Sequence, residues 1–153
     1  MTISSIDSPI EQKHSGKGNP NAILIFDVEL NSRQQALLEA LPEYDSHVIV
    51  PRDTVNMKDL SALTAKTGDE FAMFTKGKSR LIIRGDSGSV NINTESAKDL
   101  ALRGYKWSGH THPGTDYFCL EASSGDWKVL EQFSQKSMVI YNSKGQYRRF
   151  EKG

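Results

Sequence analysis

Residues 70–85 read EFAMFTKGKSRLIIRG, two apolar runs on either side of a Lys-Gly-Lys turn. Paired runs of this length around a glycine-containing turn are typical of a β-hairpin. The pattern predicts strands at 70–76 and 79–85. Amphipathic segments with a helical period lie before and after this hairpin, so we place it at the centre of the fold.

The rest of the chain alternates between strand-like and helix-like patterns. After the hairpin we expect a short strand at 89–92, a helix over 95–104 capped by Thr94, a strand at 105–113, a helix at 123–135 and a closing hairpin over 137–152. Before it we expect a strand at 22–28, a helix at 32–41 capped by Asn31, a strand at 47–50 and a helix at 57–67 ended by Gly68. This layout predicts an α/β (α+β) fold with one central mixed sheet flanked by helices.

The segments also predict a division of the chain. Residues 1–21 are polar and rich in Ser, Gly, Pro and Asn, which is typical of a flexible arm or linker. Residues 22–56 form an N-terminal lead-in of strand, helix and strand. Residues 57–153 form the core that carries the functional motifs.

Composition excludes several classes of function. The chain has 153 residues with 19 Lys and Arg and 19 Asp and Glu, so its charge predicts neither a nucleic-acid partner nor a membrane surface. We interpret Lys76, Lys78 and Arg80 as a solvated hairpin. The N-terminus lacks a signal-peptide pattern, and the single cysteine cannot form an intrachain disulfide. We expect a cytoplasmic protein or a domain released from a larger secreted or phage-encoded protein.

Two histidines give the sharpest local signal, in the sequence Gly109-His110-Thr111-His112-Pro113. In a strand, side chains at i and i+2 lie on the same face, with Cα atoms roughly 7 Å apart at about 3.3 Å per residue. Since a Zn–N bond is about 2.0–2.1 Å, both imidazoles can converge on one ion. Gly109 is expected to leave room near the metal, and Pro113 to end the strand. Two unligated histidines on an exposed edge are the alternative.

Ser123 and Asp126 open the helix that follows the histidine pair. Residues three apart share a helix face, so both side chains can project toward the same site. Asp126 would supply an oxygen ligand at about 2.0–2.2 Å, and Ser123 a hydroxyl donor. The same Ser-x-x-Asp pattern is typical of a helix start, with the serine as the N-cap.

Glu70 begins the first strand of the central hairpin. Alternation places Glu70, Ala72 and Phe74 on one face of this strand. A carboxylate among small and apolar neighbours is desolvated, which suits a group that shuttles protons. An exposed glutamate paired with Lys76 or Lys78 is the alternative.

The glutamate strand, the His-x-His-Pro sequence and the Ser-x-x-Asp turn together resemble the JAMM metalloproteases, whose fold is the MPN domain. The likeness covers about residues 57–150, and the motifs and their supporting elements follow the order found in that family. The resemblance implies an MPN-like (cytidine-deaminase-like) sheet and zinc-dependent hydrolysis of a peptide or isopeptide bond. A protein or peptide substrate is implied, including ubiquitin-like conjugates.

The resemblance also implies a role for each residue. His110, His112 and Asp126 would bind Zn²⁺, with water in the open fourth position. Glu70 would take a proton from that water and deliver it to the leaving amine. Ser123 would steady the oxyanion of the tetrahedral intermediate.

The sequence leaves other ligands and lineages open. The loop between the histidines and Ser123 is longer than is usual in the family and carries Asp116, Cys119 and Glu121, which are rival ligands. Ala72 stands where the family commonly has glycine. Residues 4–27, SSIDSPIEQKHSGKGNPNAILIFD, with the helix expected after them, resemble the junction and lead-in of modules at the C-terminal ends of bacterial and phage toxin-like proteins. This resemblance fits a toxin-associated processing module.

Two other functions compete with a peptidase. A catalytically silent MPN scaffold would bind a protein partner, but such a scaffold is expected to have lost part of the ligand set. A zinc deaminase would need His-x-Glu followed by Cys-x-x-Cys, which the single cysteine excludes.

Overall fold

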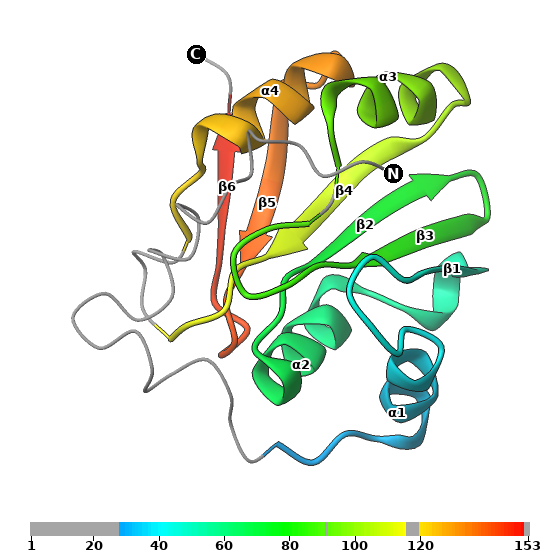
Figure 1. Cartoon of the computed structure of the whole chain (residues 1–153), viewed down its shortest axis with the longest axis vertical. Helices are drawn as coiled ribbons and strands as arrows, with labels where there is room; N and C mark the ends of the chain where they lie inside the picture. Colours follow the sequence, from blue (N-terminus) through cyan, green and yellow to red (C-terminus); the bar gives the residue numbers. More distant parts are fainter. Residues whose placement is uncertain (1–27, 91, 116–119, 152–153) are drawn as a thin grey trace.

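Six strands form one mixed sheet in the order β1-β3-β2-β4-β5-β6 in the computed structural model, which describes residues 28–90, 92–115 and 120–151 (Figure 1). The strands are β1 (His47–Pro51), β2 (Phe71–Lys76), β3 (Ser79–Arg84), β4 (Lys106–Thr111), β5 (Ser137–Tyr141) and β6 (Tyr147–Glu151). Strands β4 and β5 run parallel, and the other neighbours run antiparallel. The predicted central hairpin is therefore β2 and β3, in the middle of the sheet.

Helices cover both faces of this sheet, so the predicted mixed sheet flanked by helices is confirmed. The helices are α1 (Ser32–Glu39), α2 (Met57–Thr67), α3 (Thr94–Leu102) and α4 (Ser124–Gln132), with a short 3-10 turn η3 (Arg52–Thr54) after β1. Helices α1 and α2 pack on one face, and α3 and α4 pack on the other (Figure 1). None of the described helices combines the length and the apolar character needed to cross a bilayer.

Alternation along β2 divides the core into two clusters. Ala72 and Phe74 belong to the cluster under α3 and α4, whereas Phe71 and Met73 belong to the cluster under α2. All four side chains are buried because the strand lies between two helical layers. Burial of one large apolar side chain stabilises the fold by about 1.5–3 kcal/mol, so this strand anchors both halves of the core.

Capping residues set the ends of α1 and α2 where the sequence predicts them. The Asn31 side chain accepts a hydrogen bond from the Gln34 backbone at the start of α1. Gly68 ends α2 in the left-handed conformation with φ of 76°, which glycine adopts without steric cost. Asp59, in the first turn of α2, binds Arg33 and Gln34 of α1 and so joins the two helices.

Two predictions differ from the structure, and a third cannot be compared with it. The predicted strand at 89–92 is wrong, since the residues described there pair with no strand. The loop before it folds into a turn in which the Asp86 carboxylate accepts hydrogen bonds from the backbones of Gly88 and Ser89. The cap of α3 is Asn93 rather than Thr94. The predicted strand at 22–28 lies outside the described residues, except for Val28, which is not in a strand.

Candidate metal centre

The candidate site lies where β2 begins and β4 ends. These strands are antiparallel neighbours with Ala72 opposite His110, so the residue before β2 and the residues at the end of β4 meet at one edge. The backbone of Glu70 is held there by hydrogen bonds with Gly85 and Asp86, at 2.7 and 2.8 Å. The N-terminus of α4 also reaches this edge, because Asp126 contacts both histidines.

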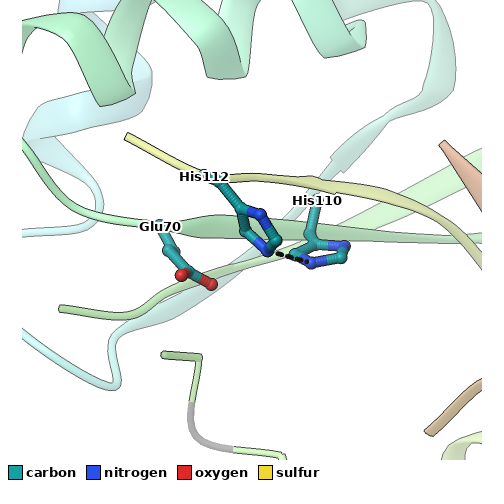
Figure 2. Close-up of side chains that lie close together, drawn as sticks. All are labelled: Glu70, His110 and His112. Atoms are coloured by element: carbon teal, nitrogen blue, oxygen red, sulfur yellow. Dashed lines mark hydrogen bonds between the residues drawn. The ribbon is translucent and has the colours of Figure 1, made fainter. Parts of the chain in front are cut away.

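His110 and His112 point their Nε2 atoms at each other. The two atoms are 2.8 Å apart, and the rings meet edge to face with centroids 4.6 Å apart (Figure 2). Both side chains are buried. The shared face predicted from the i, i+2 spacing is therefore present, and the alternative of two exposed histidines is wrong.

Glu70 completes a buried group that could hold a metal ion. One ligand atom each from Glu70, His110 and His112 can be chosen so that all lie within 4.8 Å of one another. Figure 2 shows the Glu70 carboxylate on the side toward which both rings point. Glu70 is 3% exposed, so the alternative of an exposed edge-strand glutamate is wrong.

Asp126 both caps α4 and approaches the histidines. Its Oδ1 lies 3.1 Å from His110 Nε2, and its Oδ2 lies 3.6 Å from His112 Nε2. The same carboxylate accepts a hydrogen bond from the Ser123 backbone, and the Ser123 hydroxyl accepts one from the Asp126 backbone. The Asp126 carboxylate thus caps α4 and also faces the two histidines. The interpretation of Ser-x-x-Asp as a helix start is therefore compatible with its interpretation as part of the site.

The electrostatics of Asp126 favour its ionised form. Burial alone would raise the pKa of this carboxyl. The charge and hydrogen bond of His110, the charge of His112 and the Ser123 backbone N–H together outweigh burial and hold the pKa well below its usual range. Asp126 is therefore an anion facing two imidazoles.

Of the three rival ligands from the preceding loop, the structure describes only Glu121. Glu121 is exposed and lies outside the buried group of Glu70, His110 and His112. Asp126 also lies outside that group, but unlike Glu121 it is buried and contacts both histidines. Asp116 and Cys119 lie outside the described residues.

A β-bulge in β4 sets the wall of the site. Between Met73 and Phe74 of β2, the partner on β4 changes from Gly109 to Trp107, so Ser108 is an extra residue. A bulge reverses the alternation of side chains beyond it. Trp107 consequently lies on the same side as His110 and stacks on its ring, with centroids 5.1 Å apart and planes at 22°.

Gly109 has a different role from the expected one. A Cβ atom there would lie 2.9 Å from Val139 Cγ2, 3.0 Å from the Val139 carbonyl oxygen and 3.1 Å from Met57 Sδ. These atoms belong to β5 and α2, on the face opposite to the histidines. Glycine thus permits close packing behind the site, and the prediction that it leaves room for the metal is wrong.

A small cavity adjoins the candidate ligands. Its volume is about 20 Å³, and Glu70, His110 and Asp126 line it together with apolar residues that include Trp107 and Val129. A cavity of at least about 10–15 Å³ with polar partners can hold one water molecule. The three polar groups therefore surround a space that fits a single water.

The donor set suits a zinc-like ion. Two nitrogens bound to one tetrahedral zinc at about 2.0–2.1 Å lie roughly 3.3 Å apart. The histidine Nε2 atoms are 2.8 Å apart, so a separation of about 0.5 Å more would satisfy that geometry. Imidazole nitrogen with carboxylate oxygen is a common donor set for catalytic zinc, and the buried site offers two of each.

Sequence reasoning missed two residues that surround the site. Trp107 was not singled out because strict alternation places it on the opposite face from His110. Met138 of β5 lies with its Sδ 3.3 Å from His110 Nδ1, a contact made through the parallel pairing of β4 with β5. The Trp in the sequence YKWSGHTHP was the available signal for the first of these.

Comparison of this chain with protein-family models, with characterised proteins and with solved structures gives no match. The family resemblance of the three motifs accordingly stays a prediction. The arrangement of Glu70, His110, His112 and Asp126 is therefore the basis on which a function can be inferred.

Proposed function

We propose that the protein is a zinc-dependent hydrolase of the JAMM type that cleaves a peptide or isopeptide bond. One observation carries this proposal, namely that two buried imidazoles with facing Nε2 atoms are flanked by two carboxylates from separate elements. Three protein ligands with one open position are typical of catalytic zinc, whereas structural sites use four. We assign His110, His112 and Asp126 as the ligands, which leaves Glu70 for the chemistry.

Zinc held by these ligands would polarise the scissile carbonyl and lower the pKa of the attacking water. Glu70 would accept the proton of that water, a role supported by its place in the lining of the one-water cavity beside His110. The carboxylic acid then delivers the same proton to the leaving nitrogen as the C–N bond breaks. Buried walls keep other water away from this transfer.

Ser123 is assigned to the oxyanion. Its hydroxyl oxygen accepts the Asp126 backbone N–H at 3.0 Å, and it donates to no other residue in the part of the chain that the structure describes. The hydroxyl hydrogen is therefore available to a developing negative charge. A donor of this kind is worth roughly 3–4 kcal/mol in the transition state.

Metal content and hydrolysis test this function together. Untagged protein should retain about one zinc per chain after incubation with zinc and dialysis, by elemental analysis. The variant His112→Ala should lose the ion. His47→Ala, which removes an exposed histidine of β1, should keep it. Zinc-loaded protein should then cleave members of a panel of ubiquitin-like conjugates and peptides, and a chelator should abolish the cleavage.

The two measurements separate the proposal from its nearest competitor. Retained zinc without cleavage of any conjugate or peptide would favour a scaffold that binds a protein partner. Absence of zinc from the wild-type protein would remove the basis of both the ligand assignment and the hydrolytic activity.

A further inference from the structure

A second polar hollow lies at the end of the sheet opposite to the candidate metal centre. Its volume is about 730 Å³. Four cationic residues line it, Arg52, Arg80, Lys106 and Lys136, and no carboxylate is among its described lining residues. Strand β2 ends and β4 begins here, whereas the metal centre lies where β2 begins and β4 ends. The hollow is thus a separate site.

The positive charges of this hollow have no carboxylate partner in the part of the chain that the structure describes. Within residues 28–90, 92–115 and 120–151, none of the four cations forms an ion pair with a carboxylate. The Arg80 guanidinium donates to the Val55 carbonyl, and Arg52 donates to the Gly77 carbonyl at 3.3 Å. Burial, and then the charge of Arg52, lower the pKa of Arg80. Two guanidinium groups are therefore held close to each other by neutral partners, an arrangement that an anion would stabilise.

The register of the sheet sets the distance across which the four cations of the hollow are spread. Thr75 of β2 lies opposite Arg80 on one side and opposite Lys106 on the other. Lys136 directly precedes β5, the next strand. Neighbouring strands are about 4.8 Å apart, so the backbones of β3 and β5 are separated by roughly 14 Å. One carboxylate or phosphate cannot reach across this span, but an extended peptide of four to five residues can, at about 3.3 Å per residue.

We propose that this hollow binds an acidic segment of a partner protein, with successive Asp or Glu side chains meeting Arg52, Arg80, Lys106 and Lys136. Ser134, which is exposed, also lines the hollow, and its hydroxyl can add a hydrogen-bond donor, whereas the Ser108 hydroxyl is bonded to the Thr75 hydroxyl at 2.6 Å. Lys76 and Lys78 are exposed, as the interpretation of this turn as a solvated hairpin predicts, whereas Arg80 is half-buried and shares the hollow with three other cations.

A peptide fits the surface better than a nucleic acid. Proteins that hold single strands combine cations with exposed aromatic rings that stack on bases. The aromatic residues of this hollow are Trp107, which is 4% exposed, and the half-buried Phe133. The chain as a whole is neutral, with 19 basic and 19 acidic residues, so it lacks the wide positive field of nucleic-acid-binding domains.

Binding of acetylated hexaglutamate amide tests this inference, with hexaglutamine as the neutral control peptide. The measurements are isothermal titration calorimetry and ¹⁵N–¹H spectra in metal-free buffer of low ionic strength, so neither hydrolysis nor zinc contributes. We expect hexaglutamate to bind and hexaglutamine not to bind. The amide signals that shift should belong to 75–80 and 106–108. Binding should weaken as salt is raised, since screening shortens the range of these charges.

Paired charge-removing variants localise the effect. Arg52→Gln combined with Lys136→Gln removes two exposed cations of the hollow, and binding should weaken about tenfold, as expected for two partly exposed ion pairs. Lys98→Gln with Lys128→Gln removes the same charge from α3 and α4 outside the hollow and should change affinity less than about twofold. Equal weakening in both double variants, or no binding of hexaglutamate at all, would overturn the proposal.

Two further probes distinguish the class of ligand. If hexathymidylate binds more tightly than hexaglutamate, the ligand of the hollow is a nucleic acid and the proposal of an acidic peptide is wrong. If inorganic phosphate binds as tightly as hexaglutamate, a single small anion is enough to occupy the hollow. That result would contradict the inference that the ligand must span about 14 Å from β3 to β5. Weak binding by both probes supports the acidic segment.

Discussion

The Nδ1 atom of His110 lies 3.3 Å from the Sδ atom of Met138. A histidine that binds metal through Nε2 carries its proton on Nδ1, and the partner of that proton fixes the orientation of the ring. Partners of this kind are usually carboxylates or carbonyl oxygens, whereas a thioether is a weak acceptor. Met138 therefore contacts His110 from behind as a weak acceptor, and we expect this contact to fix the orientation of the ring.

Met138→Leu should weaken zinc binding while leaving the fold intact. Leucine keeps the apolar volume but removes the acceptor, so we expect about a tenfold loss of zinc affinity, the lower end of the effect of outer-shell partners. Competition with a chromophoric chelator measures this affinity. Met73→Leu is the matched control, because Met73 is equally buried but belongs to the opposite face of the sheet. Equal losses in both variants would reduce Met138 to a packing residue.

Glu70→Gln should separate metal binding from catalysis. If Glu70 moves protons and is not a ligand, the variant keeps about one zinc per chain. Hydrolysis should then fall by about 10²–10⁴-fold, the usual worth of general acid–base catalysis. Elemental analysis and initial rates on the same preparation decide between the roles. Loss of zinc in this variant would make Glu70 a ligand, which its position beside both histidines also permits.

Asp126 and Ser123 share one helix cap, so their variants distinguish ligand from cap. Asp126→Ala should reduce zinc affinity by more than about a hundredfold, beyond the effect of an outer-shell residue. Ser123→Ala should cost about 1 kcal/mol of stability through the lost cap and should keep the metal. Glu121→Ala, which removes an exposed carboxylate nearby, is the control for charge. If Asp126→Ala retains zinc, Asp126 is not a ligand and serves only as part of the helix cap.

The sequence predicted those features that depend on near neighbours. The face shared by His110 and His112 follows from the period of a strand, and the end of α2 follows from Gly68. The apolar alternation of β2 was also readable, because both of its faces contact helices and each face therefore needs its own apolar residues.

Features that depend on distant partners were not predicted. Trp107 reaches the side of His110 through a bulge that is fixed by pairing with β2. The segment 89–92 has the alternation of a strand, yet Val90 and Ile92 are buried in the core without strand partners, after a turn closed by the Asp86 carboxylate. The charge-lined hollow likewise forms only when four separate segments meet.

Gly109→Ala should destabilise the fold and weaken the metal site at once. The new methyl group would lie 3.0 Å from the Val139 carbonyl oxygen, and β4 is paired with β5 at this position, so the backbone has little room to move. We expect a loss of about 1–3 kcal/mol, as for other overpacked positions. Urea denaturation measures it. Adding Val139→Ala removes the nearest methyl and should restore part of the stability, whereas purely additive losses would contradict the contact.

The junction of α1 with α2 gives a prediction for acid stability. Asp59 is 3% exposed, and burial alone would raise its pKa. Hydrogen bonds from Arg33, the Asn56 backbone and Gln34, together with the charge of Arg33, outweigh burial and lower the pKa. In the unfolded chain this carboxyl returns to about 3.9. Protons therefore bind the unfolded state more readily, and the stability from Asp59 is complete above that value and is lost as the pH falls through the lower, folded pKa.

Asp59→Asn should remove this dependence. At pH 7 the variant should be less stable by on the order of 1–3 kcal/mol, because hydrogen bonds to a charged group are lost. Between about pH 5 and pH 3 the wild-type protein should lose stability more steeply than the variant, so the two curves converge in acid. Urea titrations at each pH measure both. Asp53→Asn, at an exposed position in η3, should follow the wild-type curve. Parallel curves for wild type and Asp59→Asn would mean that the carboxylate at the start of α2 gains no stability from its ionisation.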